Sequence, residues 1–366
     1  MVKKIINKIK LDAITPFLLR ITKKGISIDL SERFVLFHLL ERLHGKIEEN
    51  PYLNFLSILN YQKSFEKTLS ETVEKFYKKR NSFYFKRFFK YDEIYTAVKH
   101  EISEVYHINK KAKLTIFKNG LLVYDNYNIK NFNVLLLTLH SGEFVPQNIK
   151  NKFEISDIKR KKEEDIHSDK LYRNIVLEQG GIWINNKMSR FYCDLNRSMD
   201  ECIYSNPKAD KTDSDIWEKE LTRKERNSIL SFYDEFYLLL KSVIETYSFN
   251  IIFDGHTMRD GKRRPNVSFG THYIPKFYLP IVTSLKRKIV AMGYENCAIN
   301  QPYKGGHILA WISKQYPSVF TFSMEINKKL YLCSNRLKLN VKNTEKIAID
   351  LLKIFDIQEE EGYRFN

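Results

Sequence analysis

The first third of the chain shows apolar residues at helical spacing. In residues 32–43 they recur at every third or fourth position behind Ser31, a residue type that commonly begins helices. Residues 61–79 repeat this pattern with more charges, and residues 83–89 combine aromatic with basic side chains. Such a stripe can grip a nucleic acid or a lipid surface, but more often its rings pack inward while Lys and Arg point outward. We predict that residues 1–110 form a mainly helical region of unknown role.

From about residue 112 the spacing of apolar residues becomes that of strands. Residues 113–117 and 121–124 flank Asn119-Gly120, a dipeptide typical of hairpin turns. Residues 133–139 are almost continuously apolar, as in a strand buried on both faces. Further strands are expected at 182–184, 250–253, 298–300, 319–324 and 331–333, and helices at 223–247 (with Thr222 as N-cap), 278–291, 308–314 and 344–355.

This alternation predicts an α/β domain over residues 111–366, in which helices flank a mixed, mostly parallel sheet. The sequence contains no run of about 18 apolar residues, so we expect no membrane-spanning helix. Lys8, Lys10 and Asp12 interrupt the N-terminal stretch that most resembles a signal peptide.

The chain is strongly basic, with 61 Lys and Arg against 44 Asp and Glu, a formal charge of +17. Such an excess attracts polyanions, anionic membrane surfaces or acidic substrates, although a Lys-rich solvated surface is the commoner cause. Nucleic-acid binding has only this charge to support it, since no arginine-rich motif or Cys/His finger occurs. The four cysteines include no C-x-x-C pair, which favours a reducing compartment and hence the cytoplasm.

Two expected strands end in histidines that could bind one metal ion. His140 follows the apolar strand 133–139, and Glu143 lies three residues later. His256 follows another strand, behind Asp254. Ligands bind beyond the carboxyl ends of strands in open α/β sheets, and imidazole and carboxylate groups are ordinary zinc ligands. His140, Glu143 and His256 are therefore candidate zinc ligands, with Asp254 as the partner of a histidine ring.

Three further segments carry polar residues that suit the same chemistry. Glu325 ends a strand, where a carboxylate could take a proton from water and return it to a leaving amine. Arg190 could polarise a scissile carbonyl, while Asn196 and Arg197 could hold a substrate carboxylate. The loop before Gly305-Gly306 would turn two residues towards a ligand, namely Tyr303 and Lys304. Taken singly, each of these residues is commoner on a surface or in a plain loop.

The segments that carry these residues are LHSGEFVP, CDLNRSMD, FDGHTMRD, QPYKGGH and MEINKKLY. A further segment, EDIHSDKLY, lies between the first two. In this order they resemble the N-formylglutamate amidohydrolase family over roughly residues 130–335. One segment would be weak support, whereas five in order at expected strand ends are specific. That family is similar in turn to zinc carboxypeptidases, succinylglutamate desuccinylases and aspartoacylases.

The resemblance implies a zinc-dependent hydrolase that cleaves an amide bond next to a carboxylate in a small N-acyl amino acid or a peptide. It assigns zinc binding to His140, Glu143 and His256, with Asp165 or Asp169 as alternatives to Glu143. It makes Glu325 the general base and Arg190 the group that polarises the carbonyl. The substrate would be bound by Asn196, Arg197, Tyr303 and Lys304.

Two other functions remain open. The same residues would serve a zinc carboxypeptidase that trims a peptide or an acidic tail. A basic protein that binds nucleic acid or lipid through residues 1–110 would instead show salt-sensitive binding. Such a protein would tolerate His140→Ala and Glu325→Ala. A family member that keeps zinc but has lost turnover is disfavoured by the presence of every candidate group.

Overall fold

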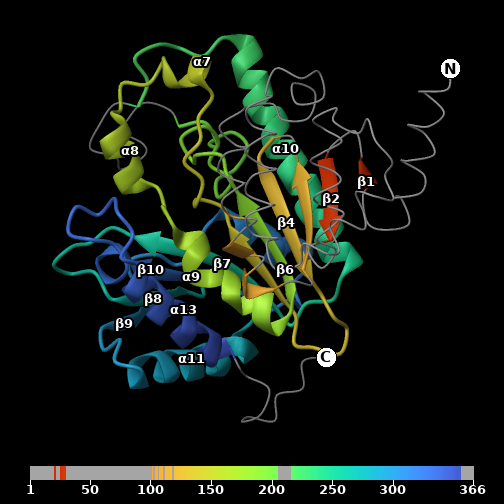
Figure 1. Ribbon diagram of the computed structural model, residues 1–366, viewed down its shortest axis with the longest axis vertical. Helices are drawn as coiled ribbons and strands as arrows, with labels where there is room; N and C mark the ends of the chain where they lie inside the picture. Colours follow the sequence, from red (N-terminus) through yellow and green to blue (C-terminus); the bar gives the residue numbers. More distant parts are fainter. Residues whose placement is uncertain are drawn as a thin grey trace, which may run out of the picture. The chain divides into compact units, whose positions relative to one another are not determined.

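The computed structural model describes residues 20–21, 25–29, 101, 104–105, 107–109, 112–117, 119–204 and 216–355 (Figure 1). The chain divides into two compact units, residues 1–126 and 127–366. None of the described helices is both long and apolar enough to cross a membrane.

The described residues of the first unit include four antiparallel strands. They are β1 (Arg20–Ile21), β2 (Gly25–Asp29), β3 (Lys113–Phe117) and β4 (Leu121–Asn126), and each pairs with the next. The hairpin predicted at Asn119-Gly120 is confirmed, because Gly120 adopts a positive φ of 92° and its N–H donates to the Phe117 carbonyl.

Strands β1 and β2 were not predicted, and the expectation that residues 1–110 are mainly helical stays a prediction. Residues 25–29 alternate apolar and polar side chains and pair with β3, which lies far along the chain. The periodicity of a short segment does not show which distant strand it will pair with. The helices expected at 32–43, 61–79 and 83–89 lie outside the described residues.

The second unit is built on a mixed, mostly parallel sheet, as predicted. The strand order is β6 (Gly181–Asn186), β5 (Val134–Thr138), β7 (Ile251–Met258), β10 (Thr321–Asn327), β8 (Val267–Gly270) and β9 (Cys297–Ile299). All neighbouring pairs are parallel except β10 with β8. Strand β8 was not predicted, and the strand expected at 331–333 is only a single bridge from Leu332 to Leu339.

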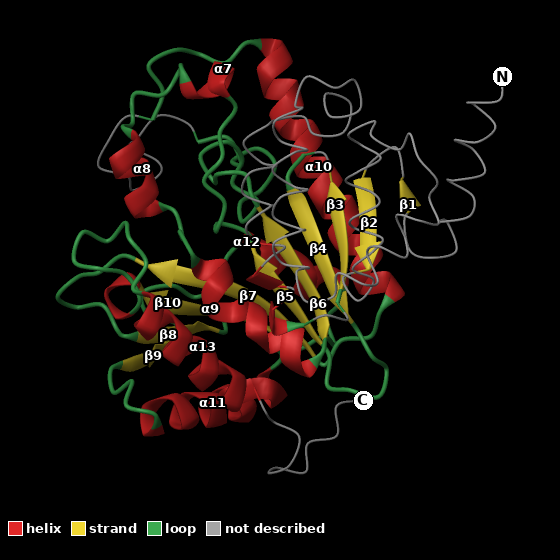
Figure 2. Ribbon diagram, in the orientation of Figure 1, coloured by secondary structure: helices red, strands yellow, loops and turns green. Residues whose placement is uncertain are grey.

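Helices cover both faces of this sheet. Figure 2 shows α9 (Ser168–Asn174) and α13 (Val341–Phe355) in front of the strands, α11 (Leu279–Ala291) below β9, and α10 (Arg223–Thr246) behind the strands. The N-cap predicted at Thr222 is confirmed, since its side chain accepts the Glu225 N–H and the Glu225 carboxylate accepts the Thr222 N–H. The remaining helical segments are α7 (Gln147–Lys150), α8 (Asp157–Glu163), η3 (Ile175–Gln179), η4 (Lys276–Tyr278), α12 (His307–Gln315) and η5 (Lys328–Leu330).

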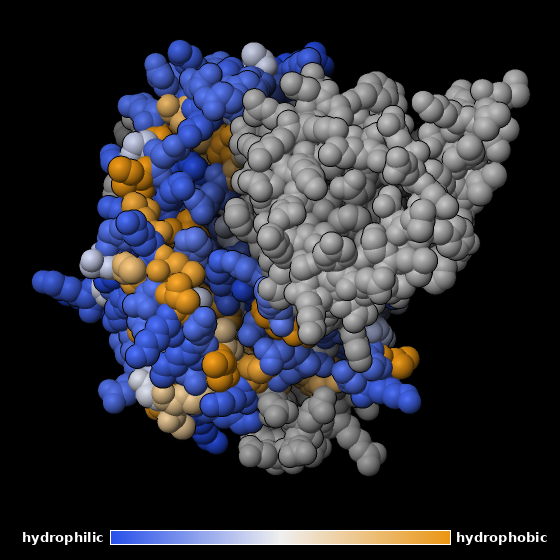
Figure 3. All heavy atoms as spheres, viewed as in Figure 1, coloured by the Kyte–Doolittle hydropathy of each residue, from blue (hydrophilic) through white to orange (hydrophobic). Residues whose placement is uncertain are grey.

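The apolar runs of the central strands form the core. Every residue of β5, β7 and β10 is buried, and the rings of Tyr172, Phe253, Phe322 and Phe355 pack against one another in front of them. On the face shown in Figure 3, hydrophilic residues predominate and hydrophobic ones occur in separate spots. Because β5, β7 and β10 are parallel, their carboxyl ends meet at one edge of the sheet, where polar side chains gather.

Candidate metal centre and active site

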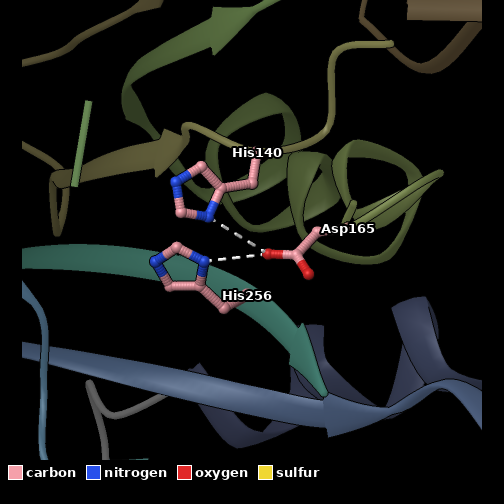
Figure 4. Close-up of side chains that lie close together, drawn as sticks. All are labelled: His140, Asp165 and His256. Carbon is pink, nitrogen blue, oxygen red and sulfur yellow. Dashed lines mark hydrogen bonds and ion pairs between the residues drawn. The ribbon is translucent and has the colours of Figure 1, made fainter. Parts of the chain in front are cut away.

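Three buried side chains from distant parts of the sequence converge at this edge. His140 follows β5, His256 lies within β7, and Asp165 lies between α8 and α9. One potential ligand atom from each lies within 4.8 Å of the others. In Figure 4 the two imidazole rings turn one nitrogen each towards the same Asp165 oxygen. That oxygen, Oδ2, lies 2.9 Å from His256 Nδ1 and 3.6 Å from His140 Nδ1.

The His140 ring is fixed by a second carboxylate. Its Nε2 lies 2.7 Å from Oδ1 of Asp194, which is fully buried. Because a carboxylate only accepts, Nε2 carries a proton, and Nδ1 is the nitrogen that faces Asp165. Within the described part of the chain, Nδ1 is a buried polar atom without a hydrogen-bond partner. Such an atom is costly unless it receives a partner, and a cation is one that suits it.

The His256 ring is held in the same way by Asp254. Its Nε2 lies 2.7 Å from Oδ2 of Asp254, while its Nδ1 faces Asp165. Burial lowers the pKa of His256, but Asp254 and Asp165 outweigh it and raise that pKa well above the ordinary value. The ring therefore carries a proton on Nδ1, at the position where a metal ion would take its place.

Hydrogen bonds connect Asp165 to His140 and to the strand that carries His256. The Asp165 N–H donates to the His140 carbonyl at 3.1 Å, and Thr257 Oγ1 donates to Asp165 Oδ1 at 3.0 Å. Burial would raise the pKa of this carboxyl group, yet the neighbouring His140 and His256 hold it well below its usual range. Asp165 thus has one carboxylate oxygen held by Thr257 and the other directed towards the two histidine rings.

The structure does not bring Glu143 to this group. The Glu143 carboxylate is 34% exposed and lies 2.6 Å from Lys161. Asp169 likewise points elsewhere, since it pairs with Lys187 at 3.0 Å. Of the alternatives open in the sequence, only Asp165 accompanies His140 and His256.

Glu325 lies beside His256. The two residues are direct partners in the parallel pairing of β10 with β7, and Glu325 is 9% exposed. Burial raises the pKa of Glu325 to about 8, opposed by His256 and reinforced by Asp165. A carboxyl group with a pKa in this range can both accept and return a proton near neutral pH.

Tyr172 explains the glycine in the Asp-Gly-His segment. A Cβ atom on Gly255 would lie 2.6 Å from the Tyr172 ring, which α9 presses against β7. The Tyr172 hydroxyl donates to the carbonyl of His256 at 2.8 Å and lies 3.2 Å from that of Met324. It therefore joins β7 and β10 next to His256 and Glu325.

Arg190 and Arg197 surround Asp194. Arg190 Nη2 donates to Asp194 Oδ2 at 2.7 Å and its Nε donates to the Tyr204 hydroxyl at 2.8 Å. Arg197 Nε lies 3.6 Å from the same Asp194 oxygen, and its guanidinium stacks on the Tyr204 ring at 4.5 Å. Both arginine side chains stay partly exposed, at 25% and 28%.

Asn196 is engaged within the protein. Its Oδ1 accepts the Ile308 N–H at 3.0 Å, and its Nδ2 lies 3.0 Å from Nε2 of His256. Gly306 makes this approach possible, because a Cβ there would lie 2.1 Å from Asn196 Oδ1. Asn196 thus connects the Asp194 loop, His256 and the start of α12.

Tyr303 and Lys304 are exposed in the loop before α12. Arg264 Nη1 donates to the Tyr303 hydroxyl at 2.8 Å, and the Lys304 carbonyl accepts the His272 N–H at 3.0 Å. The structure does not bring either side chain into the group of His140, Asp165 and His256.

The donor set fits a divalent metal such as zinc. Two imidazole Nδ1 atoms and one carboxylate oxygen converge, and a buried carboxylate orients each ring from behind. Histidine and aspartate are common zinc ligands, and three protein ligands are typical of catalytic rather than structural sites. Among the described residues this is the one His/Cys/Asp/Glu group with such spacing.

A model of the family described as N-formylglutamate amidohydrolase matches residues 132–332. The chain belongs to the N-formylglutamate amidohydrolase family. All the residues of the site, from His140 to Glu325, lie inside the matched segment. Family membership indicates a hydrolase of the amidohydrolase kind.

Solved structures share the fold. N-formylglutamate amidohydrolase from Ralstonia eutropha is 20% identical, with a TM-score of 0.54 over 64% of this chain and 95% of its own. A gene product from Agrobacterium tumefaciens is 16% identical, with a TM-score of 0.51 over 64% of this chain and 91% of its own. No curated protein matches this chain.

Proposed function

We propose that this protein is a zinc-dependent amidohydrolase that cleaves an amide bond next to a carboxylate, in an N-acyl amino acid. The observation that carries the proposal is the convergence of His140, Asp165 and His256, in which a buried His140 Nδ1 faces Asp165 without a hydrogen bond. Family membership supports the reaction class, and this donor set supports the metal.

In this proposal Asp165 Oδ2 and the Nδ1 atoms of His140 and His256 hold zinc, in place of the set with Glu143. Asp194 and Asp254 fix the orientation of the two rings and raise their basicity as ligands. When bound, zinc supplies Lewis acidity for a carbonyl group and lowers the pKa of water.

Glu325 moves the proton. Its buried carboxylate accepts a proton from the attacking water and donates it to the leaving nitrogen, as its raised pKa favours. A bound cation would lower that pKa and favour the anionic form that accepts the proton.

The two arginines bind and orient the substrate. Arg190 is held by Asp194 and Tyr204 and donates to the developing charge on the scissile carbonyl. Arg197 binds the substrate carboxylate, for which a guanidinium fork is suited. Asn196 supports this loop through its internal bonds rather than by gripping substrate. Tyr303 and Lys304 form the outer wall of the substrate site.

The substrate test uses zinc-loaded protein with N-formyl-L-glutamate, other N-acyl amino acids and peptides that end in a free carboxylate. We expect formate or another acyl acid to be released, and release to be lost in Glu325→Gln. Release of C-terminal amino acids from peptides would point to a carboxypeptidase. No hydrolysis of either class by the zinc-bound protein, or equal hydrolysis by the variant, would overturn the proposal.

We also place the protein in the cytoplasm. Its four cysteines are all free, which suits a reducing compartment. The positive net charge suits an acidic substrate, and the sequence has no dedicated nucleic-acid-binding motif.

A further inference from the structure

Lys328 is a buried lysine that the proposed reaction does not use. It begins η5, three residues after Glu325, and only 2% of it is exposed. Its Nζ donates to the carbonyls of Lys162 and Glu164, at 2.7 and 2.5 Å. A lysine is seldom buried without a strong reason, because its amine must be taken out of water.

The two carbonyls belong to the end of α8, just before Asp165. A helix leaves its last carbonyls without intrahelical partners, and a lysine is well suited to satisfy them. Lys328 therefore fixes the point at which the chain leaves α8 and turns to present Asp165. It does so from the turn that directly follows the strand carrying Glu325.

Tyr331 holds the other side of Asp165 from the same turn. Its buried hydroxyl donates to the Ile166 carbonyl at 2.9 Å and lies 3.3 Å from Thr257 Oγ1, which itself donates to Asp165. Lys328 and Tyr331 thus bind the chain immediately before and immediately after Asp165, through main-chain atoms.

We propose that Lys328 and Tyr331 are positioning residues that form a clamp, holding the Asp165 segment in its metal-binding position before the metal arrives. This role rests on the proposed zinc site. The clamp also ties the placement of Asp165 to that of Glu325, since both depend on the short stretch from Glu325 to Tyr331. Preorganisation of this kind raises metal affinity because less conformational entropy is lost when the metal binds.

The direction in which Lys328→Met changes zinc affinity distinguishes a positioning role from a purely electrostatic one. A positive charge near Asp165 repels a cation, so if Lys328 acted only by its charge, Lys328→Met would strengthen zinc binding. If Lys328 positions Asp165, Lys328→Met should instead weaken zinc binding. If Lys328 supported the fold alone, its loss would lower Tm without changing the zinc affinity of the folded protein.

The experiment measures the Kd for Zn²⁺ by competition with a chromogenic chelator in the full-length wild type, Lys328→Met, Tyr331→Phe and Lys329→Met. Lys329 is the exposed neighbour in the same turn and serves as the matched control. Circular dichroism in excess chelator checks folding. We expect Lys328→Met to weaken zinc binding about 10- to 100-fold, as for other residues that support metal ligands, and Lys329→Met to leave it unchanged. Tyr331→Phe should weaken it too, which keeps the test decisive if Lys328→Met does not fold.

Unchanged or tighter zinc binding by folded Lys328→Met would overturn the clamp while leaving the zinc site in place. If Lys328→Met does not fold, unchanged binding by Tyr331→Phe would overturn the clamp in the same way. Absence of zinc binding by the wild type would overturn both the site and the clamp.

Discussion

Asp194 Oδ1 lies 2.7 Å from His140 Nε2, and both side chains are buried. This contact decides which ring nitrogen carries the proton, because the carboxylate can only accept. The other nitrogen, Nδ1, faces Asp165. The same Asp194 also accepts a hydrogen bond from Arg190, so one carboxylate aligns both a proposed metal ligand and the arginine that we propose for the substrate carbonyl.

Asp194→Asn should weaken zinc binding about 10- to 100-fold, since an amide cannot reliably fix the Nε2–H tautomer of His140. The Kd for zinc, measured by chelator competition, checks this. Asp200→Asn serves as the control because Asp200 is exposed in the same segment. An unaltered Kd in Asp194→Asn would show that His140 needs no such partner.

Glu325→Gln should lower kcat by roughly 10²- to 10⁴-fold, the usual contribution of a general base or acid. Zinc content should stay at the wild-type level because Glu325 is not a proposed ligand. Steady-state kinetics beside metal analysis check both points. Full activity in Glu325→Gln would assign proton transfer to another group.

Gly306→Ala should damage the site although the change is a single methyl group. The new Cβ would lie 2.1 Å from Asn196 Oδ1 and would push Asn196 away from His256. We expect reduced activity and a lower Tm. Gly261→Ala is the control, because its Cβ would meet only the flexible Arg264 side chain at 3.5 Å. Equal behaviour of the two variants would contradict the role given to Asn196.

The buried Lys187–Asp169 pair should be important for stability. Lys187→Met would remove the hydrogen-bonded partner of the buried Asp169 carboxylate, and breaking a buried ion pair in this way typically costs about 3–5 kcal/mol in the free energy of unfolding. Urea denaturation at neutral pH checks this value. Loss of less than about 1 kcal/mol, the range of a surface pair, would show that the pair is not buried in solution.

The same pair has a defined pH dependence. Burial alone would raise the pKa of Asp169, but Lys187 and Arg173 lower it from 3.8 to about 2. A carboxyl group with a lowered folded pKa stabilises the protein fully above its unfolded pKa, and this stabilisation fades as pH falls through the folded value. The stability difference between wild type and Asp169→Asn should therefore be constant above about pH 5 and shrink between pH 4 and 2. A difference that grew on acidification would contradict this.

The sequence predicted those parts of the site that follow buried strands. His140, His256 and Glu325 each stand where an apolar run ends, and parallel strands bring such ends together. Asp165 gave no comparable signal, because it follows a short charged helix and its approach depends on contacts with His140 and Thr257. Spacing alone favoured Glu143, whose side chain turns to Lys161 instead.

The secondary structure was likewise predicted in part. Strands and helices whose apolar residues show a clear periodicity were predicted close to their observed bounds. Strand β8 was missed because its four residues show too short a pattern, and its place beside β10 is set by a long-range antiparallel pairing. Strand β2 was missed for the same reason, since its partner β3 lies more than eighty residues later.

Metal analysis of chelator-free protein tests the central claim most directly. Wild type, Glu143→Ala, Asp165→Ala and the His140→Ala/His256→Ala double variant would be purified alike, reloaded with zinc and measured by elemental analysis. We predict about one zinc per chain in the wild type and in Glu143→Ala, and almost none in the other two. A wild type that takes up no zinc, or zinc lost in Glu143→Ala but kept in Asp165→Ala, would contradict the metal centre described here.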